Sequence, residues 1–207
     1  MTKKTVLKYL KKTSWFLFSA LFFAAALLFD IRDNTTKINH AIHQKIQVEF
    51  SHQVAELEKQ LDDAIANTKK PKVNKTGFLF HTYINKELVS WNTTQMPTEA
   101  HLTSLKPKQG IYKLKNGYYY ICSKVKGDTI IQGSILIQHD YQIENEYLEN
   151  TFNTSLYNGP ATIILSKTGT YSIKDNKDNH VFYIKNNPNL NSFAANANIT
   201  FVLLVLS

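Results

Sequence analysis

An apolar run near the N-terminus constrains this 207-residue chain more than any other feature. Residues Trp15 to Phe29, WFLFSALFFAAALLF, carry no charge and contain one hydroxyl residue, Ser19. At roughly −0.3 to −0.6 kcal/mol each, the nine Leu and Phe residues of the run favour membrane insertion by about 3 to 5 kcal/mol. The sequence therefore predicts a transmembrane helix over residues 14–31, with flanking residues extending the short run to a full span.

The charges around the run predict its orientation. Five lysines precede it, whereas Asp30, Arg32 and Asp33 follow it. By the positive-inside bias, residues 1–13 form a basic cytoplasmic tail and residues 32–198 lie outside the membrane. A cleavable signal peptide is the alternative, because Ala24–Ala26 resembles a cleavage site; the apolar run continues past these alanines, which favours an uncleaved anchor.

A second apolar run, ITFVLLVLS, covers residues 199–207. Nine helical residues span about 13 Å, less than half of a hydrocarbon core of roughly 30 Å. We expect this run to be the start of a second, truncated transmembrane helix, reached through an Asn-rich loop. A final buried β-strand is the alternative, because periodicity does not separate short apolar helices from buried strands.

The overall charge of +8 does not indicate a nucleic-acid partner. Five of the positive charges precede the first apolar run, and the others are scattered without a basic stripe. The single cysteine, Cys122, excludes an internal disulfide and is expected to be a buried apolar residue.

Between the two apolar runs, the hydrophobic period changes from helical to strand-like. Residues 37–68 lack Gly and Pro and carry apolar residues three or four positions apart, which predicts a long helix. Strands alternating with turns follow over residues 77–186, beginning with a hairpin around Asn85 and Lys86. We expect a short helix from Asp140 to Asn150 within them. The predicted fold class is α+β: a long helix followed by an antiparallel sheet with a short inserted helix.

No motif for catalysis, phosphate binding or metal binding occurs. His40 and His43 share a helical spacing but lack a third ligand, so a solvated helix face is the favoured interpretation. His139, beside Asp140, lacks a nearby nucleophile, which favours a structural histidine over an acid–base catalyst. His52 lacks the acidic neighbour and the Arg-Thr-Pro turn of a phosphoacceptor histidine. We expect no catalytic residue, metal or cofactor in this chain.

The segment Asn116 to Asn153 carries a resemblance to a known family. It reads NGYYYICSKVKGDTIIQGSILIQHDYQIENEYLENTFN, with an aromatic strand after Asn-Gly, a Gly-Asp turn and an N-x-Y-L-x-N-x-F-N ending. This pattern, with LVSWNTTQMP before it, resembles the extracytoplasmic input region of bacterial membrane-bound two-component sensor histidine kinases. The likeness covers residues 77–186. It is compatible with a sensor domain of the PAS or Cache type.

The resemblance implies a sensing domain in a bacterial cytoplasmic (inner) membrane, acting as a homodimer on a small-molecule or envelope signal. It also implies a cytoplasmic kinase region after residue 207, through which a cognate response regulator would be reached. Candidate ligand-binding residues are Trp91, Tyr118, Tyr120 and His139, because aromatic and polar groups line such pockets; core or cross-strand roles are the alternative. The rival function is a membrane-anchored or secreted binding or adhesion protein without kinase activity.

Overall fold

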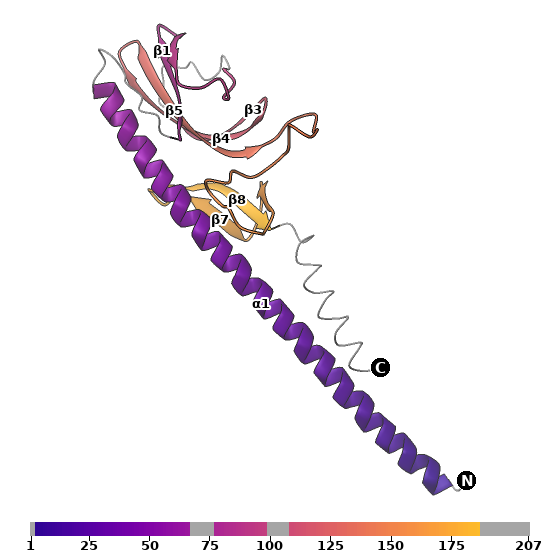
Figure 1. Cartoon of the computed structure of the whole chain (residues 1–207). Helices are drawn as coiled ribbons and strands as arrows, with labels where there is room; N and C mark the ends of the chain where they lie inside the picture. Colours follow the sequence, from indigo (N-terminus) through magenta and orange to yellow (C-terminus); the bar gives the residue numbers. More distant parts are fainter. Residues whose placement is uncertain (1–2, 67–76, 99–107, 187–207) are drawn as a thin grey trace. The chain divides into compact units, whose positions relative to one another are not determined.

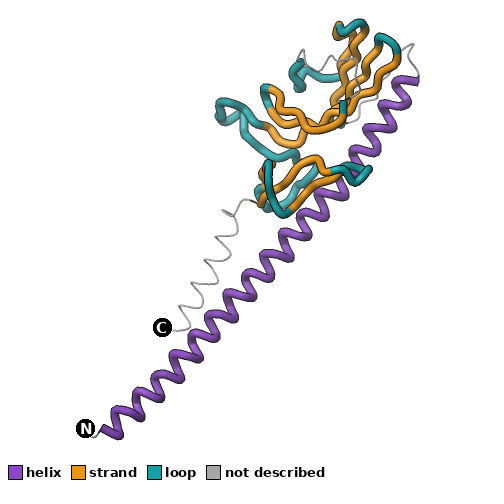
Figure 2. Tube along the Cα trace, turned by 180° about the vertical axis from the view of Figure 1, so that it is seen from behind, coloured by secondary structure: helices purple, strands orange, loops and turns teal. Residues whose placement is uncertain are grey.

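The computed structural model describes residues 3–66, 77–98 and 108–186, with side chains from residue 18 onward except at position 31. It confirms the α+β class: one helix, α1 (Lys3–Ala66), precedes eight antiparallel strands (Figures 1 and 2). The chain divides into two compact units after Ile42. The second expected membrane segment, residues 199–207, lies outside the described residues.

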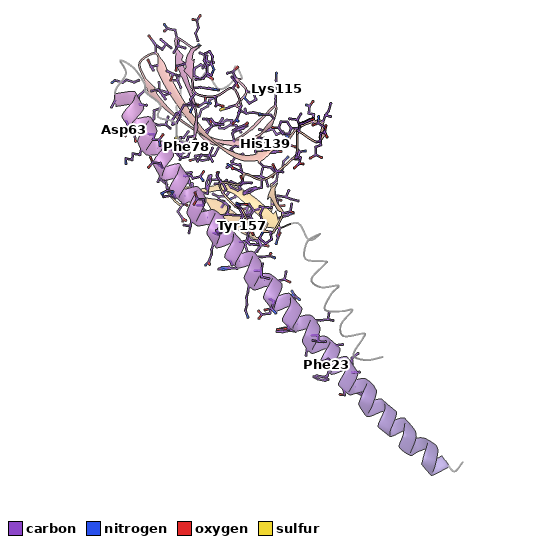
Figure 3. All side chains as sticks on the ribbon, in the orientation of Figure 1. Phe23, Asp63, Phe78, Lys115, His139 and Tyr157 are labelled. Carbon is purple, nitrogen blue, oxygen red and sulfur yellow. The ribbon has the colours of Figure 1, made fainter. Side chains whose placement is uncertain are left out.

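Helix α1 is longer than the helix predicted over residues 37–68, because it also includes the N-terminal apolar run. No Gly or Pro interrupts residues 3–66, so the backbone meets no helix breaker. In the first unit, almost all described apolar side chains of the run are exposed; Phe22 is 77% exposed, and Phe23 projects from the helix in Figure 3. Among residues with described side chains, no helical segment is long and apolar enough to cross a membrane. The predicted span also includes residues 14–17 and 31, whose side chains are not described.

In the second unit, α1 buries one apolar stripe. Its members are fully buried and three or four residues apart: Ile46, Phe50, Val54, Leu57 and Leu61. Burying such a side chain contributes roughly 1.5 to 3 kcal/mol relative to exposure. Ile38, the first apolar residue of the helix predicted over residues 37–68, does not belong to the buried stripe, because it is more than half exposed.

The five-stranded sheet has the order β2-β1-β5-β4-β3. Its strands are β1 (Leu79–Ile84), β2 (Glu87–Trp91), β3 (Gln109–Leu114), β4 (Gly117–Lys126) and β5 (Thr129–His139). The predicted hairpin is confirmed: Asn85 and Lys86 connect β1 and β2 with φ of 50° and 70°. Two consecutive positive φ values match the twist of a tight hairpin.

The sequence predicts a single antiparallel sheet, but the last three strands form a separate sheet. They are β6 (Ile163–Ser166), β7 (Tyr171–Lys174) and β8 (His180–Asn186), in the order β6-β8-β7. Strand β5 pairs with β1 on one side and β4 on the other, so it offers no free edge there to a later strand. Strands β2 and β3 form the edges of the five-stranded sheet, and the later strands pair with one another instead of with these edges.

The predicted helix from Asp140 to Asn150 is wrong, because this segment consists of turns and isolated bridges. The Oδ1 atom of Asn145 accepts hydrogen bonds from the backbone N–H groups of Tyr147 and Leu148. Asn150 Oδ1 accepts another from the N–H of Tyr141 at 2.5 Å. Asparagine side chains that bond nearby backbone groups compete with helix formation, and here they stabilise the turns.

Candidate functional site

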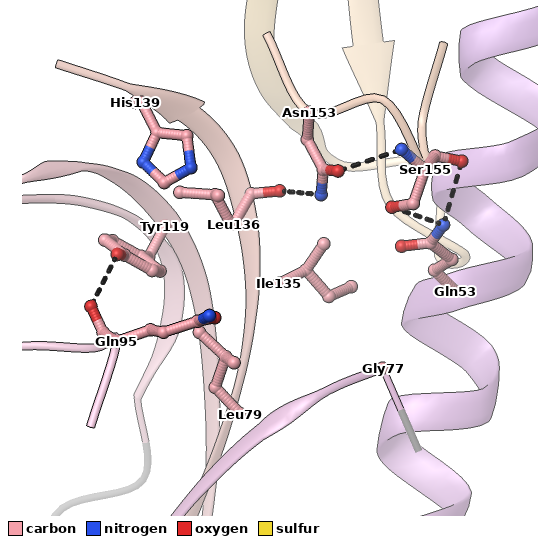
Figure 4. Close-up of a pocket in the computed structure, with 10 residues that line it drawn as sticks. All are labelled: Gln53, Gly77, Leu79, Gln95, Tyr119, Ile135, Leu136, His139, Asn153 and Ser155. Atoms are coloured by element: carbon pink, nitrogen blue, oxygen red, sulfur yellow. Dashed lines mark hydrogen bonds between the residues drawn. The ribbon is translucent and has the colours of Figure 1, made fainter. Parts of the chain in front are cut away.

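A pocket lies where β5 changes its pairing partner. The first part of β5 pairs with β1 as far as the pair Leu79 and Ser134. Beyond it, the segment 151–153 takes the place of β1: the N–H of Asn153 donates to Ile137 O, and the N–H of His139 donates to Thr151 O, each at 2.9 Å. The pocket at this junction has a volume of about 200 Å³ and is shown in Figure 4.

Ten residues from distant parts of the sequence line this junction pocket: Gln53, Gly77, Leu79, Gln95, Tyr119, Ile135, Leu136, His139, Asn153 and Ser155. They come from α1, the sheet, and the loops before β1, after β2 and after β5. A cavity of about 150 Å³ accommodates a molecule of the size of benzene. The junction pocket, at about 200 Å³, therefore has room for a small organic molecule.

Hydrogen bonds fix the polar groups around the junction pocket. Asn153 Nδ2 donates to Leu136 O at 2.6 Å, and its Oδ1 accepts from the N–H of Ser155. Gln53 Nε2 on α1 lies 3.4 Å from both Ser155 O and Ser155 Oγ (Figure 4). The pocket wall thus connects α1 to the loop that follows β5.

Among the described residues that line the junction pocket there is no Asp, Glu, Lys or Arg. Burial raises the pKa of Tyr119 to about 12, so its hydroxyl is protonated at neutral pH and acts as a donor to Gln95 O and Asn116 Oδ1. An ionised ligand would lose its hydration here without meeting an opposite charge. The lining therefore suits a small uncharged polar molecule.

Of the four predicted ligand-binding residues, only His139 lines the junction pocket. Its ring stacks on Tyr141 with centroids 5.2 Å apart, and its Nδ1 lies 3.1 Å from Tyr141 Oη. The neighbouring Asp140 forms an ion pair with Lys113 instead of bonding to the histidine.

The structure does not bring the other three candidates to this pocket. Trp91 ends β2 with 55% of its surface exposed. Tyr118 packs under Lys113, whose Nζ is 4.6 Å from the ring centroid. Tyr120 is fully buried against Phe50, and its Oη accepts from Gln109 Nε2 at 2.8 Å. Tyr120 therefore has a packing role.

Sequence reasoning missed Gln53, Gln95, Tyr119 and Asn153 as lining residues. A signal existed for Asn153, which stands at the end of the motif N-x-Y-L-x-N-x-F-N. No local pattern marks Gln53 or Gln95, because they reach the pocket only through the packing of α1 and the loop after β2.

A cluster of charged residues joins α1 to the loop after β7. Glu58 Oε1 accepts from Lys177 Nζ at 2.7 Å, and Glu58 Oε2 accepts from Asn176 Nδ2 at 2.9 Å. Burial acts to raise the pKa of Glu58, but these bonds outweigh it and the pKa is lowered. The same balance of burial against hydrogen bonds from Asn179 and Lys177 lowers the pKa of Asp175. Both carboxylates are therefore satisfied structural groups.

Within the described part of the chain, no group of three or more His, Cys, Asp or Glu side chains is placed to hold a metal ion. Comparison with family models, curated proteins and solved structures finds no match to this chain.

Proposed function

We propose that this chain is the signal-sensing region of a bacterial membrane-bound two-component histidine kinase. In this proposal residues 14–31 anchor the chain in the cytoplasmic membrane and residues 32–198 lie outside it. The protein acts as a homodimer, and a small uncharged molecule in the junction pocket is the signal. The observation that carries the proposal is the junction pocket itself, whose wall includes both α1 and the sheet.

The sheet order supports a sensing role. The five strands are arranged β2-β1-β5-β4-β3, with the first strand of the sheet beside the last. An antiparallel sheet that follows a long helix is compatible with the sensor domain that the sequence resemblance implies. A fold of this kind hosts many functions, so the order supports the class of domain and not a particular ligand.

The composition of α1 supports the membrane anchor. Its described residues 18–29 are almost all exposed and are Phe, Leu or Ala apart from Ser19. A helix that is apolar all round requires an apolar environment, in a protein core or in a bilayer. The lysine-rich start of the chain favours the bilayer, with the N-terminus in the cytoplasm.

The position of Gln53 supplies a route from ligand to helix. Its amide is shared between Glu49 Oε1 on α1 and Ser155 on the loop that lines the junction pocket. A ligand that favours one of two positions of this loop has a different affinity for each of the two conformations. Its binding therefore shifts the equilibrium between them. In the proposal, α1 carries that shift to the membrane.

The test is a chimera of the 207-residue chain with the cytoplasmic part of a histidine kinase whose response regulator drives a fluorescent reporter. Gln53→Leu removes the bonds to Ser155 while keeping the helix. We expect a several-fold change in reporter output, within the 5- to 150-fold range typical of coupling between sites. Gln44→Leu, an exposed position on the same helix, is the matched control and leaves the output unchanged.

Immunoblots of the membrane fraction make the outcomes separable. If Gln53→Leu and Gln44→Leu give equal reporter output at equal abundance in the membrane, the sensing role is contradicted. The rival function, a membrane-anchored binding protein, would then be favoured. Recovery of the unmodified chain in the soluble fraction would contradict the anchor.

A further inference from the structure

Two Asn-Gly pairs occur in the chain, Asn116-Gly117 and Asn158-Gly159. Asparagine is a thermolabile residue, and it is most reactive before glycine, because glycine has no side chain to keep its backbone nitrogen away from the asparagine amide carbon. The two pairs therefore have the same intrinsic tendency to deamidate. Their surroundings in the folded chain decide which of them can react.

The first pair is held closed by the β3–β4 hairpin. Asn116 Nδ2 donates to Gln95 O at 2.7 Å, and Asn116 Oδ1 accepts from Tyr119 Oη at 3.0 Å. Gly117 is buried and pairs with Leu114 at the start of β4. The side chain of Asn116 can turn toward the Gly117 nitrogen only after these hydrogen bonds open.

The second pair is open to solvent. Asn158 and Gly159 are exposed in the loop between β5 and β6. No hydrogen bond to another described residue holds the Asn158 side chain or the Gly159 N–H. A Cβ atom at Gly159 would overlap the ring of Tyr157, so the packing of Tyr157 requires glycine at this position. The fold thus keeps a reactive pair where neither residue is protected.

We propose that Asn158 is a site of spontaneous deamidation. The Gly159 backbone nitrogen attacks Asn158 Cγ and forms a C–N bond, the bond from Cγ to the side-chain nitrogen breaks, and ammonia leaves with the proton of the Gly159 nitrogen. Water then opens the resulting succinimide ring at either carbonyl, which gives aspartate or isoaspartate. The net change replaces one ammonia by one water, and water is the only co-reactant.

The reaction places a new charge beside a contact with α1. Lys45 Nζ on α1 lies 5.7 Å from the centroid of the Tyr157 ring, and Tyr157 directly precedes Asn158. Either product carries a carboxylate that is ionised at neutral pH, because the pKa of such a group is about 4. Isoaspartate also adds a methylene group to the backbone. The same loop lines the junction pocket through Asn153 and Ser155, but the reaction itself does not depend on the sensing role proposed above.

Incubation of the full chain in detergent micelles at mildly alkaline pH tests the proposal. Water enriched in a heavy oxygen isotope labels each carboxylate as it forms, and peptide mapping by mass spectrometry locates the label. We expect Asn158 to react about tenfold or more faster than Asn116 in the folded chain, because Asn116 must first lose two hydrogen bonds. In urea, where the hairpin and the loop are both unfolded, the two sites should react at similar rates.

Asn158→Gln is the matched control variant. It keeps an exposed amide, but ring closure through the longer side chain is slow, so position 158 should stay unlabelled while the rate at Asn116 is unchanged. Equal labelling of Asn116 and Asn158 in the folded chain would overturn the proposal, since the fold would then make no distinction between them. Absence of label at Asn158 in the folded chain, during the time in which it reacts in urea, would equally overturn it.

Discussion

Gly133 shows how one missing side chain positions α1 on the sheet. An added Cβ would lie 2.5 Å from Leu57 Cδ1 and 3.1 Å from Phe80 Cε1, so only glycine lets the helix approach β5 this closely. We predict that Gly133→Ala lowers the free energy of unfolding by about 1 to 3 kcal/mol through overpacking. Chemical denaturation of the full chain in detergent, followed by near-UV circular dichroism, measures the change.

Gly77→Ala is the control for this prediction, because no atom of the described residues lies within 4 Å of a Cβ built there. It should change stability by less than about 0.5 kcal/mol. In a Leu57→Ala background, the added cost of Gly133→Ala should be smaller than in the wild type, because the Leu57 methyl group that it meets is absent. Equal stabilities for Gly133→Ala and the wild type would show that α1 does not press on β5 as described.

His81 makes the stability of the fold depend on pH. Burial lowers its pKa in the folded chain below the ordinary value, so the unfolded chain takes up a proton first as the pH falls. The stabilising effect of neutral His81 is present above about pH 6.5 and is lost as the pH falls below that value. We predict a decline approaching about 1.4 kcal/mol for each pH unit from this one group.

Denaturant titrations between pH 5 and pH 8 test the His81 prediction. The difference between wild type and His81→Asn isolates the contribution of this residue from those of the other histidines. His52→Gln, at an exposed helix position, should keep the wild-type slope. If the free energy of unfolding of His81→Asn depends on pH as steeply as that of the wild type, a group other than His81 causes the dependence.

At the scale of elements, α1 protects the open edge of the small sheet. Strand β7 is an edge strand, and Gln47 hydrogen-bonds to both backbone groups of Lys174: its Nε2 donates to Lys174 O at 2.9 Å, and its Oε1 accepts the N–H at 2.8 Å. His43 Nε2 lies 2.9 Å from Ser172 O on the same strand. Helix side chains thus occupy backbone positions that would otherwise invite another strand.

We predict that Gln47→Ala destabilises the small sheet and makes β7 easier to open. The loss of two hydrogen bonds should cost about 1 to 3 kcal/mol, since each contributes roughly 0.5 to 1.5 kcal/mol. Amide hydrogen exchange should accelerate at residues 171–174 while the central strand β5 stays protected. Gln44→Ala, one turn earlier and exposed, is the control; uniform acceleration across both sheets would contradict a local role for Gln47.

The elements were largely predictable because their signals are local. The absence of Gly and Pro and the spacing of apolar residues over residues 37–68 predict a helix there, and alternation with Asn-Gly and Gly-Asp turns predicts the strands. The helix predicted at residues 140–150 failed because asparagine side chains hold turns there. The junction pocket was not predictable beyond His139, because it depends on the exchange of β1 for residues 151–153 along β5. Such long-range pairing leaves no periodic trace in the sequence.

At the scale of the whole molecule, the membrane anchor proposed for residues 14–31 rests on the apolar run of α1. Its nine Leu and Phe residues supply about 3 to 5 kcal/mol in favour of insertion, whereas each arginine near the centre costs roughly 2.5 to 3.5 kcal/mol. We predict that Leu21→Arg combined with Ala25→Arg reverses this balance and moves the chain out of carbonate-washed membranes. Asn34→Arg with Gln44→Arg adds the same charge to exposed positions beyond the run and should leave the chain membrane-bound. Retention of the Leu21/Ala25 double variant at the wild-type level would mean that another part of the protein holds it in the membrane, because two arginines exceed what the run can offset.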